Sequence, residues 1–307
     1  MSIPNQPLVS VIITCYNQAH FIGEAIESVR AQTYKNLEIL VVDDESADNP
    51  EQVVACYPEV RYFRQKNQGV SAARNAGVRE TEGKYVVFLD ADDQLLPQAI
   101  EMNLDHLEAH PEYGFVCGHR THIAHDGTPS PTNLRPCVDG DYDLELLRRN
   151  YIGPPSAVLH RREVLESVGG FNSLVDSSDD YDLYLRIVRR FPIRCHHGVI
   201  VEYRLHGTNT SQNNALMLRS TLNTLRRHKD RAKEGRQYRE AYEEGIRHGR
   251  EVFGEPLINE IRTHARARGE RRQALRGAAT LLRYYPQAFV KHAFRKFYCV
   301  VFKVNGI

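Results

Sequence analysis

Three aspartates directly follow an apolar run near residue 90. Residues 85–89 are apolar, and Asp90, Asp92 and Asp93 lie in the next four positions. Such a run is typical of a buried parallel strand, and open α/β sheets bind ligands at the carboxyl ends of their strands. Close carboxylates raise one another's pKa values unless a positive charge lies between them. A divalent cation carrying a phosphate-linked substrate is the simplest such partner, although an acidic turn would explain a single Asp.

Two further acidic groups lie where other predicted elements end or begin. Asp44 follows a strand predicted over 37–42, and Asp180 lies at the start of a helix predicted over 179–190. A carboxylate beside Thr14 can accept hydrogen bonds from a base or ribose. The acids near residue 90 can bind a hard cation, and a third carboxylate can act as a general base toward a hydroxyl group.

Strands and helices alternate in the part of the chain that would position these acids. The predicted strands cover 8–14, 37–42, 60–63 and 85–89, and the predicted helices cover 21–32, 50–56, 69–80 and 97–110. This order implies an α/β fold with a doubly wound, mostly parallel, Rossmann-like sheet. Neither G-x-G-x-x-G nor a G-K-[ST] loop is present, so a nucleotide would have to bind by another route.

The pattern is weaker between 111 and 214. We predict strands over 115–117 and 199–203, a polar loop or hairpin over 119–136, and helices over 161–168 and 179–190. The spacing of His119, His122 and His125 could suit a metal. Because no partner cysteine is nearby, a solvated loop is the favoured interpretation.

Composition places the chain among ordinary globular proteins. Its 307 residues are 41% hydrophobic and 26% charged, which fits one large α/β domain with an appendage, or two domains. The six scattered cysteines include no C-x-x-C pair, which argues against a zinc ribbon and for a reducing compartment. No signal peptide and no run of 18 apolar residues are evident. A cytoplasmic protein is therefore expected, and attachment to the inner face of the membrane is one of two alternatives for its basic C-terminal region.

Eight segments together resemble one enzyme family. They lie at 9–17, 28–34, 41–46, 69–77, 88–93, 168–171, 179–183 and 203–206. In this order they resemble family 2 glycosyltransferases, which have the GT-A fold, and the resemblance covers about residues 8–211. The family commonly has Gly where this chain has Glu45, and Glu where it has Asp179.

The resemblance implies a role for residues on the nucleotide side. Thr14 and Tyr16 would line the nucleotide pocket, and Asp44 would contact the uracil end of a uridine diphosphate sugar. Arg74 would lie near the nucleotide, where a guanidinium suits bidentate contacts, although a surface ion pair is the alternative.

The resemblance also implies the metal and catalytic groups. Asp90 and Asp92 match the D-x-D motif, with Asp92 facing the ribose and the metal and Asp93 a second candidate for the metal. His206 matches a histidine near the metal and diphosphate. Asp180 matches the catalytic base, and Asp179 would help to bind the nucleotide sugar.

The resemblance thus implies an inverting hexosyltransferase that uses Mn²⁺ or Mg²⁺. The donor would be a nucleotide sugar, with a UDP-hexose favoured, and the acceptor a saccharide or lipid-linked saccharide in cell-surface polysaccharide synthesis. One alternative is a nucleotidyltransferase that makes nucleotide sugars, which would need a glycine-rich loop that 17–20 does not supply. Another is a non-catalytic nucleotide- or glycan-binding relative, which predicts loss of the base or the metal acids.

Charge divides the chain near residue 214. Residues 1–214 carry 19 Lys and Arg against 30 Asp and Glu, whereas 215–307 carry 21 against 9. We predict a catalytic domain over 1–214, with a nucleotide-sugar half (1–110) and an acceptor half (111–214), and a basic helical region over 215–307. The basic, apolar segments 281–285 and 288–304 would either face an anionic membrane or pack on the catalytic domain. No recognised nucleic-acid module accompanies the charge, so no nucleic-acid partner is expected.

Overall fold

A computed structural model describes residues 6–288 except 132, 133, 135, 136, 139, 176, 208 and 268. The chain forms two compact units. The first comprises the described residues up to Leu146 together with Asn150–Gly207, and the second comprises Leu147–Arg149 and the described residues from 209 onward. The domain boundary expected at 214 stays a prediction.

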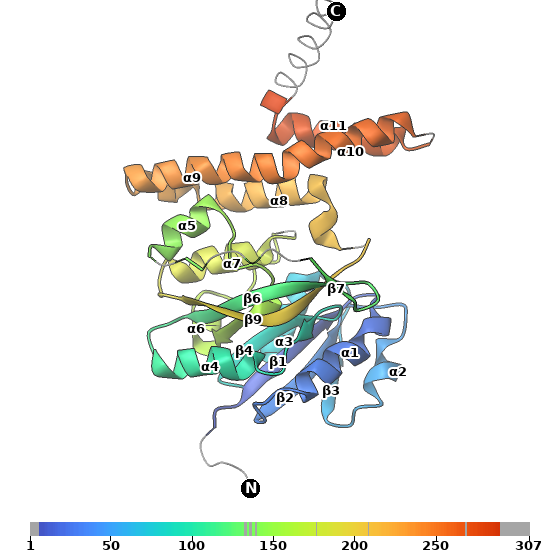
Figure 1. The fold of residues 1–307 in the computed structure, drawn as a ribbon, viewed down its shortest axis with the longest axis vertical. Coiled ribbons are helices and arrows are strands. Elements are labelled where there is room, and N and C mark those ends of the chain that lie inside the picture. The colour runs from blue at the N-terminus through green and yellow to red at the C-terminus, as the bar shows by residue number, and fades with distance from the viewer. Residues whose placement is uncertain are drawn as a thin grey trace, which may run out of the picture. The chain divides into compact units, whose positions relative to one another are not determined.

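The first unit is built on a nine-stranded sheet among the described residues (Figure 1). The strand order is β3-β2-β1-β4-β8-β6-β9-β5, and β7 pairs with β6 outside this order. The strands are β1 (Val9–Cys15), β2 (Leu37–Asp43), β3 (Val60–Arg64), β4 (Tyr85–Asp90), β5 (Gln94–Leu95), β6 (Phe115–Ala124), β7 (Pro129–Ser130), β8 (Val158–Arg161) and β9 (Arg194–Leu205).

Parallel pairing places the ends of the N-terminal strands at one edge. β1 pairs in parallel with β2 and β4, and β2 pairs in parallel with β3. β8 is antiparallel to both β4 and β6, while β6 and β9 are parallel. The predicted α/β class with a mostly parallel sheet is confirmed.

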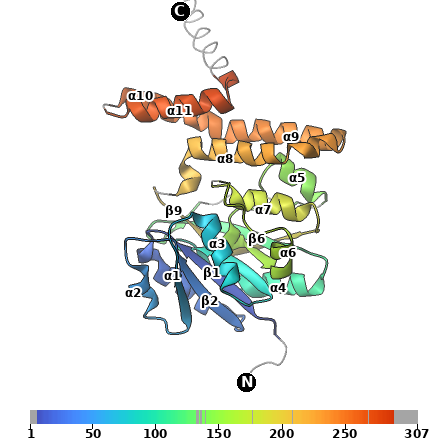
Figure 2. The ribbon, with the colours of Figure 1, turned by 180° about the vertical axis from the view of Figure 1, so that it is seen from behind.

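Helices cover both faces of this sheet (Figures 1 and 2). Alternate residues of β1 face opposite sides: Val11 joins a core with Ile26 of α1 and Leu104 of α4, whereas Ile12 lies against Gly77 of α3. The helices of this unit are α1 (Ala19–Arg30), α2 (Pro50–Val54), α3 (Val70–Arg79), α4 (Ala99–Ala109), α6 (Arg162–Ser167), α7 (Asp179–Val188) and the part of α5 (Tyr142–Arg148) up to Leu146.

The structure corrects the weakly patterned middle of the chain. Of the polar loop or hairpin expected over 119–136, the hairpin is confirmed, because residues 119–124 continue strand β6 and the end of β6 pairs antiparallel with β7. Strand β9 is longer than predicted. Strand β8 and helix α5 were not predicted. Polar residues on the half-exposed part of β6 hide the strand pattern, and its pairing with β9 depends on residues more than 70 positions away.

The second unit is helical, as predicted. Its helices are α8 (Asn214–Arg227), α9 (Arg236–Gly249), α10 (Glu255–Arg266) and α11 (Arg271–Tyr284). No helix in the described part of the chain is long and apolar enough to cross a bilayer. The basic, apolar segment predicted over 288–304 lies outside the described residues from position 289 onward.

Candidate active site

The ends of β1 and β4 bring the first predicted site residues together. Thr14 and Asp90 are direct neighbours in the parallel pair, and the Thr14 hydroxyl donates to Asp90 Oδ1 at 3.1 Å. Tyr16 follows in the turn after β1 and is 53% exposed, so its ring is available to a ligand. Asp43 at the end of β2 is the register partner of Cys15, so the acids after β2 and β4 both lie at the edge where β1 ends.

Arg74 joins this edge to the start of α7. Its guanidinium is buried and donates from Nη2 to Asp90 Oδ1 at 2.8 Å and from Nη1 to Asp179 Oδ2 at 2.9 Å. Asp179 also accepts from the Ser71 hydroxyl at 2.9 Å. Burial works against the charge on Arg74, but Asp90 and Asp179 outweigh it and raise its pKa.

This bridge changes the interpretation of Arg74. A surface ion pair is excluded, because the side chain is buried. Both terminal nitrogens hold carboxylates, so the contact expected with the nucleotide would compete with these two ion pairs. The guanidinium instead fixes the D-x-D segment against the segment that carries the proposed base.

Asp180 has the properties that a general base requires. It is half-buried in the first turn of α7, where Oδ1 accepts from the backbone N–H of Tyr181 at 2.7 Å. Burial, followed by the charge of Asp179, raises the pKa of Asp180 to about 7. A carboxylate with a pKa near the working pH can accept a proton efficiently from a hydroxyl group.

Asp92 and His206 form a second pair at the same edge. His206 Nε2 lies 2.7 Å from Asp92 Oδ2, which also accepts from Gln18 Nε2 at 3.0 Å. Burial and the neighbouring Asp90 raise the pKa of Asp92. Carboxylate and imidazole donors that converge in this way fit a divalent cation, because the cation would relieve the repulsion between the acids.

Asp93 is held differently from Asp92. Its carboxylate is 1% exposed and accepts from the Ser156 hydroxyl at 2.9 Å and from the Arg204 backbone N–H at 3.2 Å. Burial, then the charge of Asp92, raises its pKa well above the ordinary range. This geometry favours Asp92 over Asp93 as the ligand that faces a metal.

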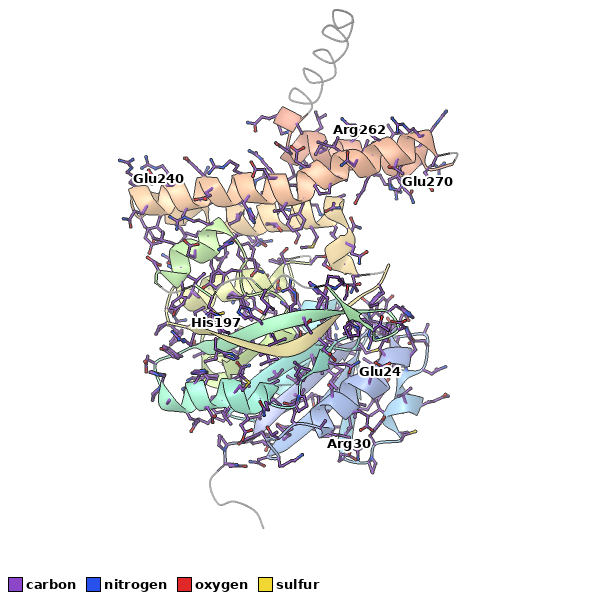
Figure 3. All side chains as sticks on the ribbon, in the orientation of Figure 1. Glu24, Arg30, His197, Glu240, Arg262 and Glu270 are labelled. Carbon is purple, nitrogen blue, oxygen red and sulfur yellow. The ribbon has the colours of Figure 1, made fainter. Side chains whose placement is uncertain are left out.

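Arg204 is a site residue that sequence reasoning did not identify. Its buried guanidinium donates to the Asp92 carbonyl at 3.0 Å and to the His125 carbonyl at 2.8 Å. It also pairs with Glu24 of α1, which Figure 3 labels. It therefore fixes the backbone of the acidic turn. Its position two residues before His206 was the available signal.

Both carboxylate oxygens of Asp44 accept hydrogen bonds from nearby residues of the protein. Oδ1 accepts from Gln65 Nε2 at 2.8 Å and from the Gln68 backbone at 3.0 Å, and Oδ2 accepts from the Gly69 backbone at 2.8 Å. The carboxylate thus orders the loop that enters α3. The next residue, Glu45, has a φ of 68°, a left-handed conformation that explains why a glycine suits this position.

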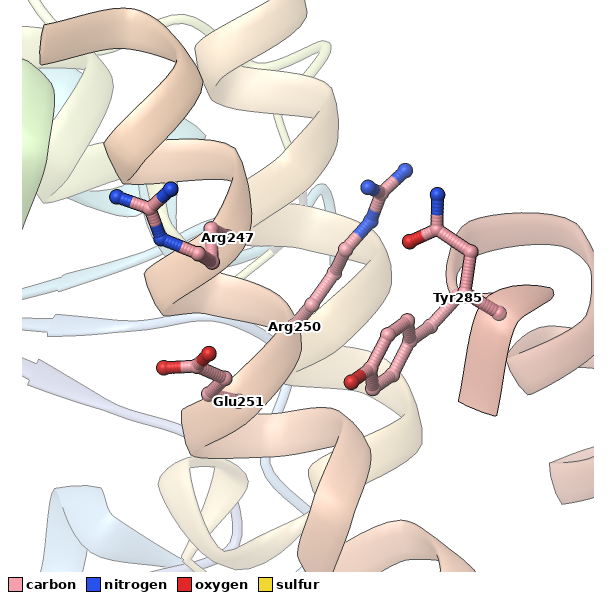
Figure 4. Close-up of a pocket in the computed structure, with 5 residues that line it drawn as sticks. Arg247, Arg250, Glu251 and Tyr285 are labelled. Atoms are coloured by element: carbon pink, nitrogen blue, oxygen red, sulfur yellow. The ribbon is translucent and has the colours of Figure 1, made fainter. Parts of the chain in front are cut away.

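A separate pocket of about 330 Å³ lies in the second unit (Figure 4). It is lined by Arg247, Arg250, Glu251, Tyr285 and Gln287. The Arg250 side chain is fixed by donation to the Tyr284 carbonyl at 3.0 Å. None of the acidic site residues lines this pocket.

Comparison with known sequences identifies similar enzymes. The family described as "Glycosyl transferase family 2" matches residues 10–169. An uncharacterized glycosyltransferase of Rickettsia prowazekii (strain Madrid E) is 30% identical over 233 residues, which cover 73% of this chain and 70% of that protein. A chondroitin synthase of Escherichia coli is 32% identical over 215 residues, covering 67% of this chain and 30% of the synthase. The chain thus spans only about a third of several of these relatives.

Solved structures with a similar fold are also glycosyltransferases. A mannosyltransferase from Pyrobaculum calidifontis, in complex with GDP-Man and Mn²⁺, matches with a TM-score of 0.60 at 20% identity over 92% of this chain and 82% of that one. S. aureus TarS with UDP-GlcNAc matches with a TM-score of 0.59 at 18% identity over 71% and 65% of the two chains. These likenesses confirm the predicted GT-A fold.

Proposed function

The chain belongs to glycosyltransferase family 2, and from this premise we propose that it transfers a hexose from a nucleoside diphosphate sugar to a saccharide hydroxyl with inversion. The observation that carries the proposal is the Arg74 bridge, because it brings a donor-side acid, Asp90, next to the segment that holds Asp180. A saccharide or lipid-linked saccharide in cell-surface polysaccharide synthesis is the proposed acceptor.

Each site residue has a defined part in this proposal. Tyr16 and Thr14 line the nucleotide side, and Asp44 orders the loop beside the nucleotide base of the donor. Asp180 removes the proton from the acceptor hydroxyl as its oxygen attacks the anomeric carbon, and the carbon–diphosphate bond breaks on the opposite face. The nucleoside diphosphate leaves in a single displacement, so no covalent sugar–enzyme intermediate forms.

We propose that Asp92 and His206 hold Mn²⁺ or Mg²⁺. When bound, the cation would stabilise the charge of the departing diphosphate. Both donor atoms lie at the sheet edge 2.7 Å apart, whereas Asp93 is turned toward Ser156 and Arg204. Uridine is the favoured base, although one similar fold holds GDP-Man and another holds UDP-GlcNAc.

A thermal-shift titration tests donor binding. UDP with Mn²⁺ should raise the melting temperature of the wild-type chain by several degrees, whereas His206→Ala should lose most of this shift because a metal ligand is missing. His228→Ala in the second unit is the matched control and should keep the full shift. If neither UDP nor GDP shifted the wild-type chain in the presence of Mn²⁺, the proposed donor site would be wrong.

We further propose that the basic second unit binds an anionic membrane surface. The excess of Lys and Arg over 215–307 and the paired arginines at the pocket of Figure 4 support this proposal. The full chain should sediment with vesicles that contain phosphatidylglycerol but not with phosphatidylcholine vesicles, and salt should release it. Equal sedimentation with both vesicle types would contradict an electrostatic membrane contact.

A further inference from the structure

The sheet carries a second group of metal-type side chains away from the acidic turn. His119 of β6, Cys137 of the segment between β7 and α5, and Cys195 of β9 have ligand atoms that all lie within 4.8 Å of one another. His119 Nε2 is 3.6 Å from Cys137 Sγ, and the two sulfurs are 2.8 Å apart. These three positions are separated by as many as 76 residues in the chain, so only the fold brings them together.

We propose that His119, Cys137 and Cys195 form a zinc site that ties the segment before α5 to strands β6 and β9. Two thiols and one imidazole match the soft and borderline ligands that zinc prefers over the oxygen ligands of manganese or magnesium. This site is therefore chemically distinct from the pair formed by Asp92 and His206.

The distance from His119 to Cys137 matches tetrahedral zinc, and the distance between the two sulfurs is shorter. Ligands at about 2.0 to 2.3 Å from zinc lie roughly 3.5 to 3.8 Å apart, and the distance from His119 to Cys137 is in this range. The two sulfurs would have to separate by about 1 Å on binding. Cys137 lies in a connecting segment rather than in a strand, so it can make this shift without breaking the pairing of β6 with β9.

Two neighbouring side chains complete the environment. Cys117 is the direct register partner of Cys195 and interacts with its thiol. The Tyr151 hydroxyl is buried, has no hydrogen-bond partner among the described residues, and lies near both of these cysteines. A thiolate produced by metal binding would be an acceptor for this hydroxyl, which is otherwise costly to bury.

The fold gives the three histidines of this cluster different surroundings. His119 was expected in a solvated loop because no cysteine is close in sequence, but the fold supplies Cys137 and Cys195. His122 instead packs edge-on against Tyr203, and His125 lies near Phe21. His197, labelled in Figure 3, lies two residues after Cys195. Its ring centroid is 5.9 Å from that of His119.

Zinc content measured by inductively coupled plasma mass spectrometry tests the site. The full chain, purified under reducing conditions, equilibrated with Zn²⁺ and desalted, should retain about one zinc per molecule. Cys137→Ser and His119→Ala should each lower the retained zinc at least tenfold. Cys56→Ser removes an exposed thiol outside the cluster and should leave the zinc content unchanged.

Two further measurements keep the test decisive if a variant folds poorly. Co²⁺ added to the wild-type chain should produce a thiolate-to-cobalt charge-transfer band, and Zn²⁺ should displace it. Absence of retained zinc in the wild type, or equal zinc in Cys137→Ser, overturns the proposal. So does a Cys137–Cys195 linked peptide pair in a non-reducing digest, together with an intact mass lower by two hydrogens, after reductant is removed under Zn²⁺, because it would show a disulfide formed with dioxygen as oxidant. None of these results depends on glycosyl transfer.

Discussion

Asp180→Asn should lower the rate of sugar transfer by about 10²–10⁴-fold while leaving nucleotide binding nearly unchanged. The amide keeps the size and the hydrogen-bonding oxygen of the side chain but cannot accept the acceptor's proton. Transfer would be measured as nucleoside diphosphate release that depends on the acceptor, and binding as the thermal shift with UDP and Mn²⁺. Asp105→Asn, an exposed acid on α4, is the matched control and should transfer at the wild-type rate.

The same carboxylate should set the acidic side of the pH profile. Because burial raises the pKa of Asp180 to about 7, the proton-accepting form predominates only above that pH. The value of kcat/KM should therefore fall about tenfold per unit as the pH drops below about 7. Asp180→Glu should keep part of the activity and shift the pH at which kcat/KM begins to fall. If Asp180→Asn transferred sugar at near wild-type rates across the pH range, Asp180 would not be the general base.

Arg74→Met should destabilise the fold by about 3–5 kcal/mol, because it leaves Asp90 and Asp179 close together without their shared cation. The methionine side chain fills much of the same space, so the loss would be mainly electrostatic. Urea unfolding followed by circular dichroism measures this change, since the chain has no Trp to report by fluorescence.

Arg79→Met provides a control on the same helix. Arg79 is exposed near the end of α3, so its replacement should change stability by less than about 0.5 kcal/mol. The loss of stability of Arg74→Lys should lie between those of Arg74→Met and Arg79→Met, because a single ammonium cannot hold both carboxylates in the geometry of the guanidinium. If Arg74→Met were as stable as Arg79→Met, the bridge would not hold the site together.

The N-terminal half of the fold was predictable because its signals are local. The strands β1, β2 and β4 are largely apolar, and β2 and β4 run directly into acids. Parallel pairing then requires Thr14 and Asp90 to meet at one edge. The acidic turn and the first turn of α7 were therefore recognisable from the chain alone.

Tertiary structure alone decided which of these residues touch one another. Arg74 reaches Asp179 across 105 positions, and Cys137 reaches Cys195 across 58. Asp92 and Asp93 are adjacent, chemically identical and both buried, but only the fold pairs Asp93 with Ser156 and the backbone of β9 and Asp92 with His206. The local sequence specifies the spacing of apolar residues and the polarity of each segment. Contacts between distant segments follow from strand register and burial, which no local pattern encodes.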